Sequence, residues 1–159
     1  MLRIERDADA MPTAVALTTG GSRGLGREMA LAFAEAGADV AIASRKLESC
    51  ETTAKDIEAF GVRAFPVAAH VGYWDQCDAL IEAAYARFGR VDILVNNAGT
   101  NIRKAPETLS VAEWSTVLNT NLTSAFACSQ AVYPYLCEAG GGKIKFLICY
   151  LRRGGGAPL

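Results

Sequence analysis

Short apolar segments alternate with amphipathic ones along this chain, and glycines stand at many of the boundaries. Residues 13–18 are rich in Val, Ala and Leu, which is typical of a strand buried on both faces of a parallel sheet. Leu25, Met29 and Phe33 then repeat at helical spacing, and Gly37 is placed to cap that helix in a left-handed conformation. The first unit is therefore predicted to be a strand, a glycine-rich loop and a helix.

The same alternation continues along the rest of the chain. Further strands are predicted at residues 39–43, 62–67, 91–95 and 143–149. Helices are predicted at residues 46–60 and 74–88, closed by Gly61 and Gly89. Ser110 and Glu113 form a capping box that opens a helix expected to reach residue 138, although Pro134 should kink or loosen its final turns. Strands alternating with helices predict an α/β fold, a Rossmann-type doubly wound parallel sheet.

Length and charge limit the classes of protein to which the chain can belong. Its 159 residues, 51% of them apolar, suffice for one core, so we expect a flexible tail at 1–12 and one domain at 13–144. A formal net charge of −1 argues against a nucleic-acid partner. The sequence has no apolar run of about 18 residues for a membrane span, and its five cysteines form no zinc-like C-x-x-C pair. We therefore expect a cytoplasmic protein with neither membrane anchor nor metal.

The loop between the first strand and the first helix has the form T-G-x-x-x-G-x-G. Glycines at such a position let the backbone approach a pyrophosphate, while the N–H groups at the helix start face its charge. A tight turn without a ligand is the alternative, but a loop between a buried strand and an amphipathic helix favours binding. The predicted cofactor-binding residues of this loop are Thr19, Gly20, Ser22, Arg23, Gly24, Leu25 and Gly26.

The end of the second predicted strand indicates which dinucleotide would bind. An acidic residue about 20 positions after the glycines binds the ribose 2′-hydroxyl of NAD, but this chain has Ser44 and Arg45 there. Arg45 and Arg23 can instead donate charge-assisted hydrogen bonds to a 2′-phosphate. NADP(H) is therefore the predicted cofactor and NAD(H) the alternative, while both arginines could also be ordinary solvated surface residues.

Three ordered motifs make residues 13–144 similar to the classical short-chain dehydrogenases/reductases. The glycine loop resembles the glycine motif of that family, Asn96-Asn97-Ala98-Gly99 resembles its N-N-A-G motif, and Asn121 matches its catalytic-tetrad asparagine. The resemblance implies an oxidoreductase that transfers hydride between NADP(H) and a secondary alcohol or ketone. It also implies an incomplete sheet, with about five of the usual seven strands, and relatives that assemble as homo-oligomers.

The resemblance assigns roles to several of these residues. Asn97, Ala98 and Gly99 would line the adenine-ribose side of the cofactor and brace the central sheet. Asn121 would kink its helix and hold a water of the proton relay, although an ordinary exposed position is the alternative. Residues 100–104 and 118–126 look like the gluconate 5-dehydrogenase and 2-deoxy-gluconate 3-dehydrogenase branch, which implies a polyol or sugar acid as the small-molecule substrate.

The chain departs from the family after its third predicted strand. There the family usually places Asp-Val against the adenine amino group, whereas this chain has His70-Val71. His70 could accept the same hydrogen bond through an unprotonated ring nitrogen. A purely structural histidine is the alternative, and a catalytic base is not expected at this position.

The catalytic Ser and the Tyr-x-x-x-Lys pair of the family are missing from this sequence. The residues four positions after Tyr73, Tyr85, Tyr133, Tyr135 and Tyr150 are Cys77, Gly89, Cys137, Ala139 and Gly154. Permitted codons from Lys145 onward, read one nucleotide later, give Asn-Phe-Ser-Ser-Ala-Ile-Phe, which resembles the expected I-N-x-S-S segment. We therefore expect residues 145–159 to be an aberrant, out-of-frame tail. The chain itself is then inactive, or alternatively a non-catalytic dinucleotide-binding fragment, with an open sheet edge that lowers its solubility.

Overall fold

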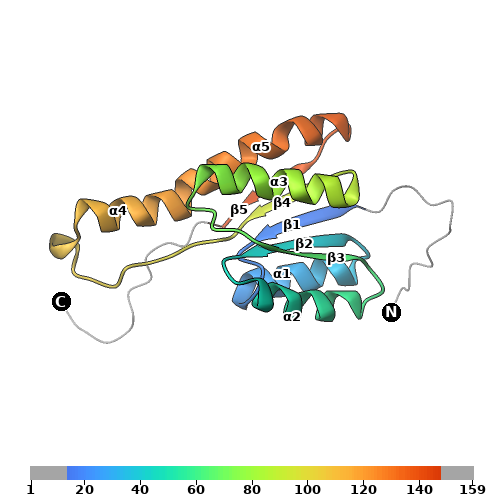
Figure 1. Cartoon of the computed structure of the whole chain (residues 1–159), viewed down its shortest axis with the longest axis horizontal. Coiled ribbons are helices and arrows are strands. Elements are labelled where there is room, and N and C mark those ends of the chain that lie inside the picture. The colour runs from blue at the N-terminus through green and yellow to red at the C-terminus, as the bar shows by residue number, and fades with distance from the viewer. Residues whose placement is uncertain (1–13, 148–159) are drawn as a thin grey trace.

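The computed structural model describes residues 14–147, so the tail predicted at 1–12 lies outside the described part. A five-stranded parallel sheet forms its centre (Figure 1). The strands are β1 (Val15–Thr19), β2 (Asp39–Ser44), β3 (Ala64–Ala68), β4 (Ile93–Asn96) and β5 (Lys143–Phe146). Their order across the sheet is β3-β2-β1-β4-β5, which confirms the predicted doubly wound α/β architecture.

Helices cover both faces of the sheet. On one face lie α1 (Gly24–Glu35) and α2 (Leu47–Glu58), and on the other lie α3 (Trp74–Phe88) and α5 (Ser124–Glu138) (Figure 1). The segment between β4 and α5 contains a short 3-10 helix (Pro106–Thr108), α4 (Val111–Leu118) and a π-helix, η2 (Asn119–Thr123). All residues of β1 are buried, as expected for a central strand covered on both sides.

Two hydrophobic clusters hold the helices to the sheet. Leu17, Ile81 and Leu94 belong to the cluster under α3 and α5, and Ile42 and Ile57 to the cluster under α1 and α2. None of these five side chains has any solvent exposure. Burial of a side chain of this size stabilises a fold by about 1.5–3 kcal/mol relative to an exposed position, so the two clusters account for the main apolar contribution.

Two carboxylates, buried Asp39 and partly buried Asp92, fix the amino ends of the strands. Asp39, 1% exposed, accepts hydrogen bonds from the backbone N–H of Arg63 at 2.7 Å and from its Nε at 2.9 Å. Asp92 accepts one from the backbone N–H of Val15 at 2.8 Å and others from Arg90. Each carboxylate thus joins neighbouring strands at the sheet edge opposite to the glycine loop.

The helix predicted at 110–138 is divided by the π-helix into α4 and α5. Its predicted capping box is confirmed, since Ser110 Oγ accepts from the Glu113 N–H at 3.2 Å and Glu113 accepts from the Ser110 N–H at 2.9 Å. Hydrogen bonds from Lys104 and Ser110 lower the pKa of Glu113 to about 2. Its carboxylate therefore stays ionised at neutral pH.

Pro134 lies inside α5 and does not end the helix, which reaches residue 138 as the sequence predicts. The helix continues through Pro134 to Glu138, and Gly140 follows with a φ of 81°. Proline removes only one N–H donor from the ladder, and buried Val132 and Leu136 flank it on the sheet-facing side. Packing against β4 and α3 therefore outweighs the local preference.

The predicted boundaries of the strands differ from the observed ones by one to two residues, and the last strand is shorter than predicted. β5 ends at Phe146, and the predicted strand residues 148 and 149 lie outside the described part. β5 forms one edge of the sheet, and three of its four residues, Lys143, Lys145 and Phe146, are exposed. It crosses residue 144, where the sequence predicts the domain to end. Backbone pairing with β4 holds it in place.

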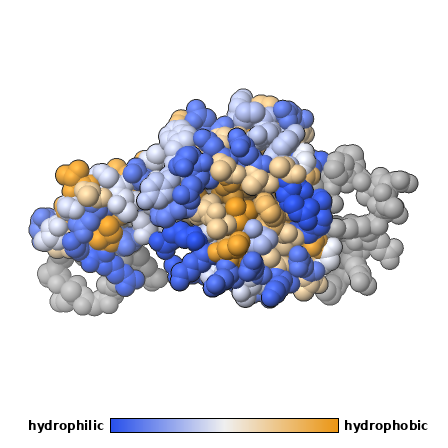
Figure 2. All heavy atoms as spheres, in the orientation of Figure 1, coloured by the Kyte–Doolittle hydropathy of each residue, from blue (hydrophilic) through white to orange (hydrophobic). Residues whose placement is uncertain are grey.

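Apolar side chains remain exposed on part of the described surface. No residue of α4 is buried, and Val111 and Trp114 are 82% and 54% exposed. Figure 1 shows α4 projecting beyond the sheet, and Figure 2 shows apolar atoms on that projection and at the centre of the visible face. None of the described helices is long and apolar enough to cross a membrane.

Replacement of Leu94 by alanine tests the packing of this core. We expect Leu94→Ala to lower the free energy of unfolding by about 2–5 kcal/mol, because the side chain is fully buried between β4 and its helices. Leu47→Ala, at a 43% exposed position on α2, is the matched control and should cost less than about 1 kcal/mol. Urea unfolding followed by circular dichroism measures both, and equal losses would contradict the assignment.

Candidate functional site

The loops at the carboxyl ends of β1 to β4 meet at one edge of the sheet. In a doubly wound fold this edge is where ligands bind, beside the strand at which the chain reverses direction across the sheet. The glycine loop leaves β1 through Gly20, which has a φ of 65°, and enters α1 at Gly24, with a φ of 54°. The Gly21 N–H donates to the Ala43 carbonyl at 3.1 Å, so the loop is held against the end of β2.

Close backbone contacts explain why two of the loop positions need glycine. A Cβ on Gly20 would lie 2.9 Å from the Asn97 amide nitrogen and 3.0 Å from the Ala98 Cα. A Cβ on Gly26 would collide with both the Gly20 carbonyl and the Asn97 amide. A Cβ on Gly24, in contrast, would meet nothing within 4 Å, so this part of the loop faces open space. The loop is therefore tight on its inner side and open on its outer side.

The start of α1 offers unused hydrogen-bond donors to that open space. Arg23 is the N-cap residue but provides no side-chain cap, and among the described residues nothing accepts from the N–H groups of Leu25 or Gly26. Free N–H groups at a helix N-terminus carry partial positive charge and bind phosphate. The residues present therefore fit the pyrophosphate of a dinucleotide.

The hydroxyl of Thr19 connects the glycine loop to the segment after β4. Its Oγ1 accepts hydrogen bonds from the backbone N–H groups of Asn97 at 3.1 Å and Ala98 at 3.0 Å, and donates to the Val95 carbonyl at 3.3 Å. Thr19 is 2% exposed. The side chain predicted to bind cofactor is thus turned into the protein, where it supports the loop that would bind it.

Two asparagines of the N-N-A-G segment complete this support. The Asn97 amide donates to the carbonyls of Thr19 at 2.9 Å and Gly20 at 3.2 Å. Buried Asn96 donates to the Ala125 carbonyl at 3.4 Å and to Ser129 Oγ at 3.2 Å, which joins β4 to α5. Ala98 is half-buried and Gly99 exposed at the same edge. These contacts join the N-N-A-G segment to the glycine loop and to α5.

Asn121 lies in the π-helix, where the sequence predicts a distortion. Its Oδ1 accepts from the Thr100 N–H at 2.7 Å, and its Nδ2 donates to the Thr100 carbonyl at 2.9 Å. Both ends of the side-chain amide are therefore used by one backbone residue of the loop after β4. Sequence analysis missed this function of Thr100, because a backbone partner leaves no mark on the residue type.

Ser44 and Arg45 at the end of β2, and Arg23 in the glycine loop, differ in their surroundings. Ser44 is half-buried and its Oγ donates to the Lys46 carbonyl at 3.1 Å, with Cys50 Sγ at the same distance. Arg45 is exposed, as is Arg23 in the glycine loop, and neither forms an ion pair with another described residue. Both guanidinium groups are thus available to an anion.

His70 follows β3 and is held by its own loop. Its backbone N–H donates to Gln76 Oε1 at 2.7 Å, and its Nδ1 accepts from the Gly72 N–H at 3.1 Å. The ring is half-buried, and the neighbouring Val71 is 7% exposed. Gln76 was not predicted as a site residue, since nothing in its spacing distinguishes it from other polar residues of α3.

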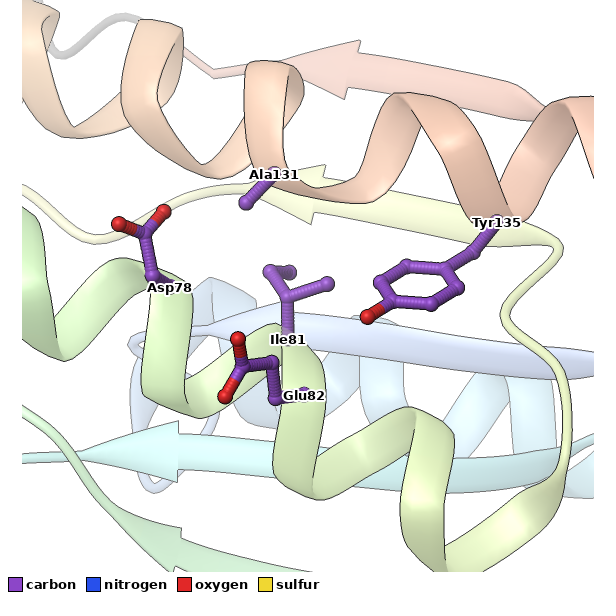
Figure 3. Close-up of a pocket in the computed structure, with 5 residues that line it drawn as sticks. All are labelled: Asp78, Ile81, Glu82, Ala131 and Tyr135. Atoms are coloured by element: carbon purple, nitrogen blue, oxygen red, sulfur yellow. The ribbon is translucent and has the colours of Figure 1, made fainter.

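Two cavities lie away from these residues, between α3 and α5. One of about 160 Å³ is lined by Asp78, Ile81, Glu82, Ala131 and Tyr135, and Figure 3 shows these side chains converging from the two helices. A second, of about 400 Å³, lies near Tyr85, whose hydroxyl donates to Glu138 at 3.0 Å and whose ring stacks on Tyr135. Neither cavity contains a predicted site residue. Within residues 14–147 no cluster of His, Cys, Asp or Glu is suited to a metal.

Comparison with known proteins identifies a family. The family model described as short chain dehydrogenase matches residues 14–148. The dehydrogenase subunit BbsD of Thauera aromatica is 39% identical over 130 residues, which cover 82% of this chain and 52% of that protein. The 3-oxoacyl-acyl-carrier-protein reductase FabG of Staphylococcus aureus is 39% identical over 134 residues, covering 83% and 54%. The chain thus spans about half the length of the curated relatives it matches.

Solved structures agree with that match. A short-chain alcohol dehydrogenase from Sinorhizobium meliloti superposes with a TM-score of 0.81 at 40% identity, covering 84% of this chain and 53% of the other. A metagenomic short-chain oxidoreductase in complex with NADP gives a TM-score of 0.79 at 32% identity, covering 82% and 60%. Both solved structures therefore share sequence as well as fold with this chain.

Adjacent threonines of β1 allow a matched test of the Thr19 contacts. We expect Thr19→Val to lower the free energy of unfolding by about 1–3 kcal/mol, because it leaves the Asn97 and Ala98 N–H groups without an acceptor. Thr18 is equally buried, but its Oγ1 has no hydrogen-bond partner among the described residues. Thr18→Val should therefore be neutral or stabilising in the same denaturation experiment. A larger loss for Thr18→Val would contradict the role of Thr19.

Proposed function

Because the chain belongs to the short-chain dehydrogenase family, we propose that it binds NADP(H) on its glycine loop, as the cofactor-binding part of an oxidoreductase. The observation that carries this proposal is the joining of the glycine loop to the N-N-A-G segment by Thr19 and Asn97. These hydrogen bonds hold a loop whose outer side presents free N–H donors, which is the arrangement that a pyrophosphate requires.

The cofactor would follow the strand order from β1 toward β3. The pyrophosphate would lie on the N–H groups of Leu25 and Gly26, and the 2′-phosphate between Arg23 and Arg45. The adenine would then reach His70 and Val71, with Asn97, Ala98 and Gly99 along the other side. The NADP named in one similar solved structure supports this choice, and NAD(H) is the alternative.

The reaction proposed for the lineage is hydride transfer between NADP(H) and a secondary alcohol or ketone. The bound cofactor supplies or accepts the hydride, while Asn121 positions the loop after β4 through Thr100. The side-chain amide of Asn121 is already hydrogen-bonded to the Thr100 backbone. A water of the proton relay would therefore bind the main chain of Asn121. Likeness of residues 100–104 and 118–126 to the gluconate branch supports a polyol or sugar acid as substrate.

The second candidate is a dinucleotide-binding module without catalysis, and the sequence itself favours it for these 159 residues. No tyrosine in the chain has a lysine four positions later, so a proton donor of the family type is absent from the sequence given. We propose that translation out of frame from residue 145 onward explains the difference. The charged Lys145 in β5 supports this proposal, since strands of such sheets are typically apolar on both faces.

We propose that the chain associates with a second copy of itself through the surface formed by α4 and α5. We also propose that the protein is cytoplasmic. Val111 and Trp114 on α4 and Phe126 and Tyr133 on α5 are all more than half exposed. Apolar side chains gathered on neighbouring helices are typical of protein interfaces, and a second copy of the same chain is the partner that the family implies.

Truncation of Arg45 tests the cofactor preference. We expect Arg45→Ala to weaken NADPH binding at least about tenfold, because a charge-assisted contact to the 2′-phosphate is lost, and to leave NADH affinity within about twofold. Arg87→Ala, at another exposed arginine near the opposite sheet edge, is the matched control and should change neither affinity. Fluorescence titration measures both cofactors. Equal weakening of NADPH and NADH would refute the assignment of Arg45.

Sequencing of the gene through and beyond codons 144 and 145 tests the proposed change of frame. A correction of one or two bases is expected to restore I-N-x-S-S and a downstream Tyr-x-x-x-Lys. The corrected protein should then oxidise or reduce substrates with NADP(H), whereas the 159-residue chain should show no turnover. A confirmed frame without these motifs would instead favour the non-catalytic binding module.

A further inference from the structure

The order of the strand ends places His70 beside the base of a bound dinucleotide. The phosphates belong at the turn after β1 and the ribose at the end of β2, so the base comes next, at the end of β3. The Ala69 N–H donates to the Ser44 carbonyl at 2.9 Å, which brings the residue before His70 against the end of β2. This placement rests on the function proposed above.

Contacts around the His70 ring fix its orientation. The Gly72 N–H donates to Nδ1, and the ring lies 4.8 Å from the ring of Tyr73, between centroids. A Cβ on Gly72 would come within 2.9 Å of Cε1, so the loop backbone fits closely against the imidazole. Gln76 holds the backbone of the same residue from α3. The side chain is therefore fixed before any ligand arrives.

The hydrogen bond from Gly72 determines which ring nitrogen carries the proton. A nitrogen that accepts a hydrogen bond is unprotonated, so the neutral imidazole carries its proton on Nε2. The half-buried ring can then offer only a donor to a ligand. The Val71 N–H also has no acceptor among the described residues. This differs from the expectation that His70 accepts from the adenine amino group.

Purine bases differ at the edge that such donors would meet. Adenine has an amino donor at position 6 and an acceptor at N1, whereas hypoxanthine has a carbonyl acceptor at position 6 and an N–H donor at N1. Each base therefore offers one acceptor and one donor to the two N–H groups of the subsite. We propose that His70 makes the base subsite a donor site, so that this chain does not select adenine over hypoxanthine. An acidic residue in its place would accept from the amino group and would repel the carbonyl oxygen of hypoxanthine.

Binding of two reduced dinucleotides to the full chain tests the proposal. The probes are NADPH and reduced nicotinamide hypoxanthine dinucleotide phosphate, which share the fluorescent nicotinamide and differ only in the base. We expect their dissociation constants to agree within about threefold for the unmodified chain. His70→Asp should favour NADPH by at least about tenfold, as one charge-assisted hydrogen bond can. His70→Asn, whose amide can donate or accept, is the matched control without preference.

A second measurement needs no variant. His70 is the only histidine of the chain, so long-range ¹H–¹⁵N correlation spectra of an untagged sample report its ring nitrogens without assignment. We expect the Nε2–H form with an unprotonated Nδ1 at a pH where the ring is neutral. A ring protonated on Nδ1 would overturn the inference, even if every variant failed to fold.

The outcomes separate this inference from the proposed function. Tenfold or stronger selection of NADPH over its hypoxanthine analogue by the unmodified chain would overturn the donor site while leaving cofactor binding intact. Failure of both dinucleotides to bind would overturn the proposed function, and the base subsite with it. Equal binding together with the Nε2–H form is the expected result.

Discussion

The hydroxyl of Thr19 is the contact on which the whole binding edge depends. It stands where β1 ends, and from one oxygen it reaches the β4 carbonyl of Val95 and the N–H groups of Asn97 and Ala98. Backbone that leaves a strand must find new hydrogen-bond partners when it is buried, and here a side chain supplies them. The glycine loop can then remain open on its outer side, because its inner side is already fixed by these bonds and by Asn97.

Sequence patterns predicted the fold well because its determinants are periodic or local. Apolar runs marked strands buried on both faces, four-residue spacing marked helices, and the capping box of Ser110 and Glu113 appears with both of its hydrogen bonds. Strand ends moved by one or two residues, since termini are determined by pairing with a neighbouring strand rather than by residue type. Pro134 is accommodated inside α5, where the buried side chains of Val132 and Leu136 flank it.

The candidate site was predicted at the level of residues but not of their contacts. Thr19 and Asn97 are predicted to bind the cofactor, and their side chains hold the backbone of the glycine loop and of the N-N-A-G segment. The water-relay role of Asn121 stays a prediction, and its side-chain amide binds the Thr100 backbone across 21 positions of sequence. Such contacts depend on side-chain direction and on backbone partners, and neither is encoded in the spacing of residue types.

The last strand, β5, shows that strand pairing depends little on the identity of the side chains. Backbone N–H and carbonyl groups pair identically whatever side chain they carry, so Lys143, Lys145 and Phe146 occupy β5 although they are exposed. The Leu147 N–H still donates to the Asn96 carbonyl at 2.8 Å, which continues the ladder past the proposed change of frame. A segment that carries exposed side chains can thus complete a strand, because β4 supplies the backbone groups with which it pairs.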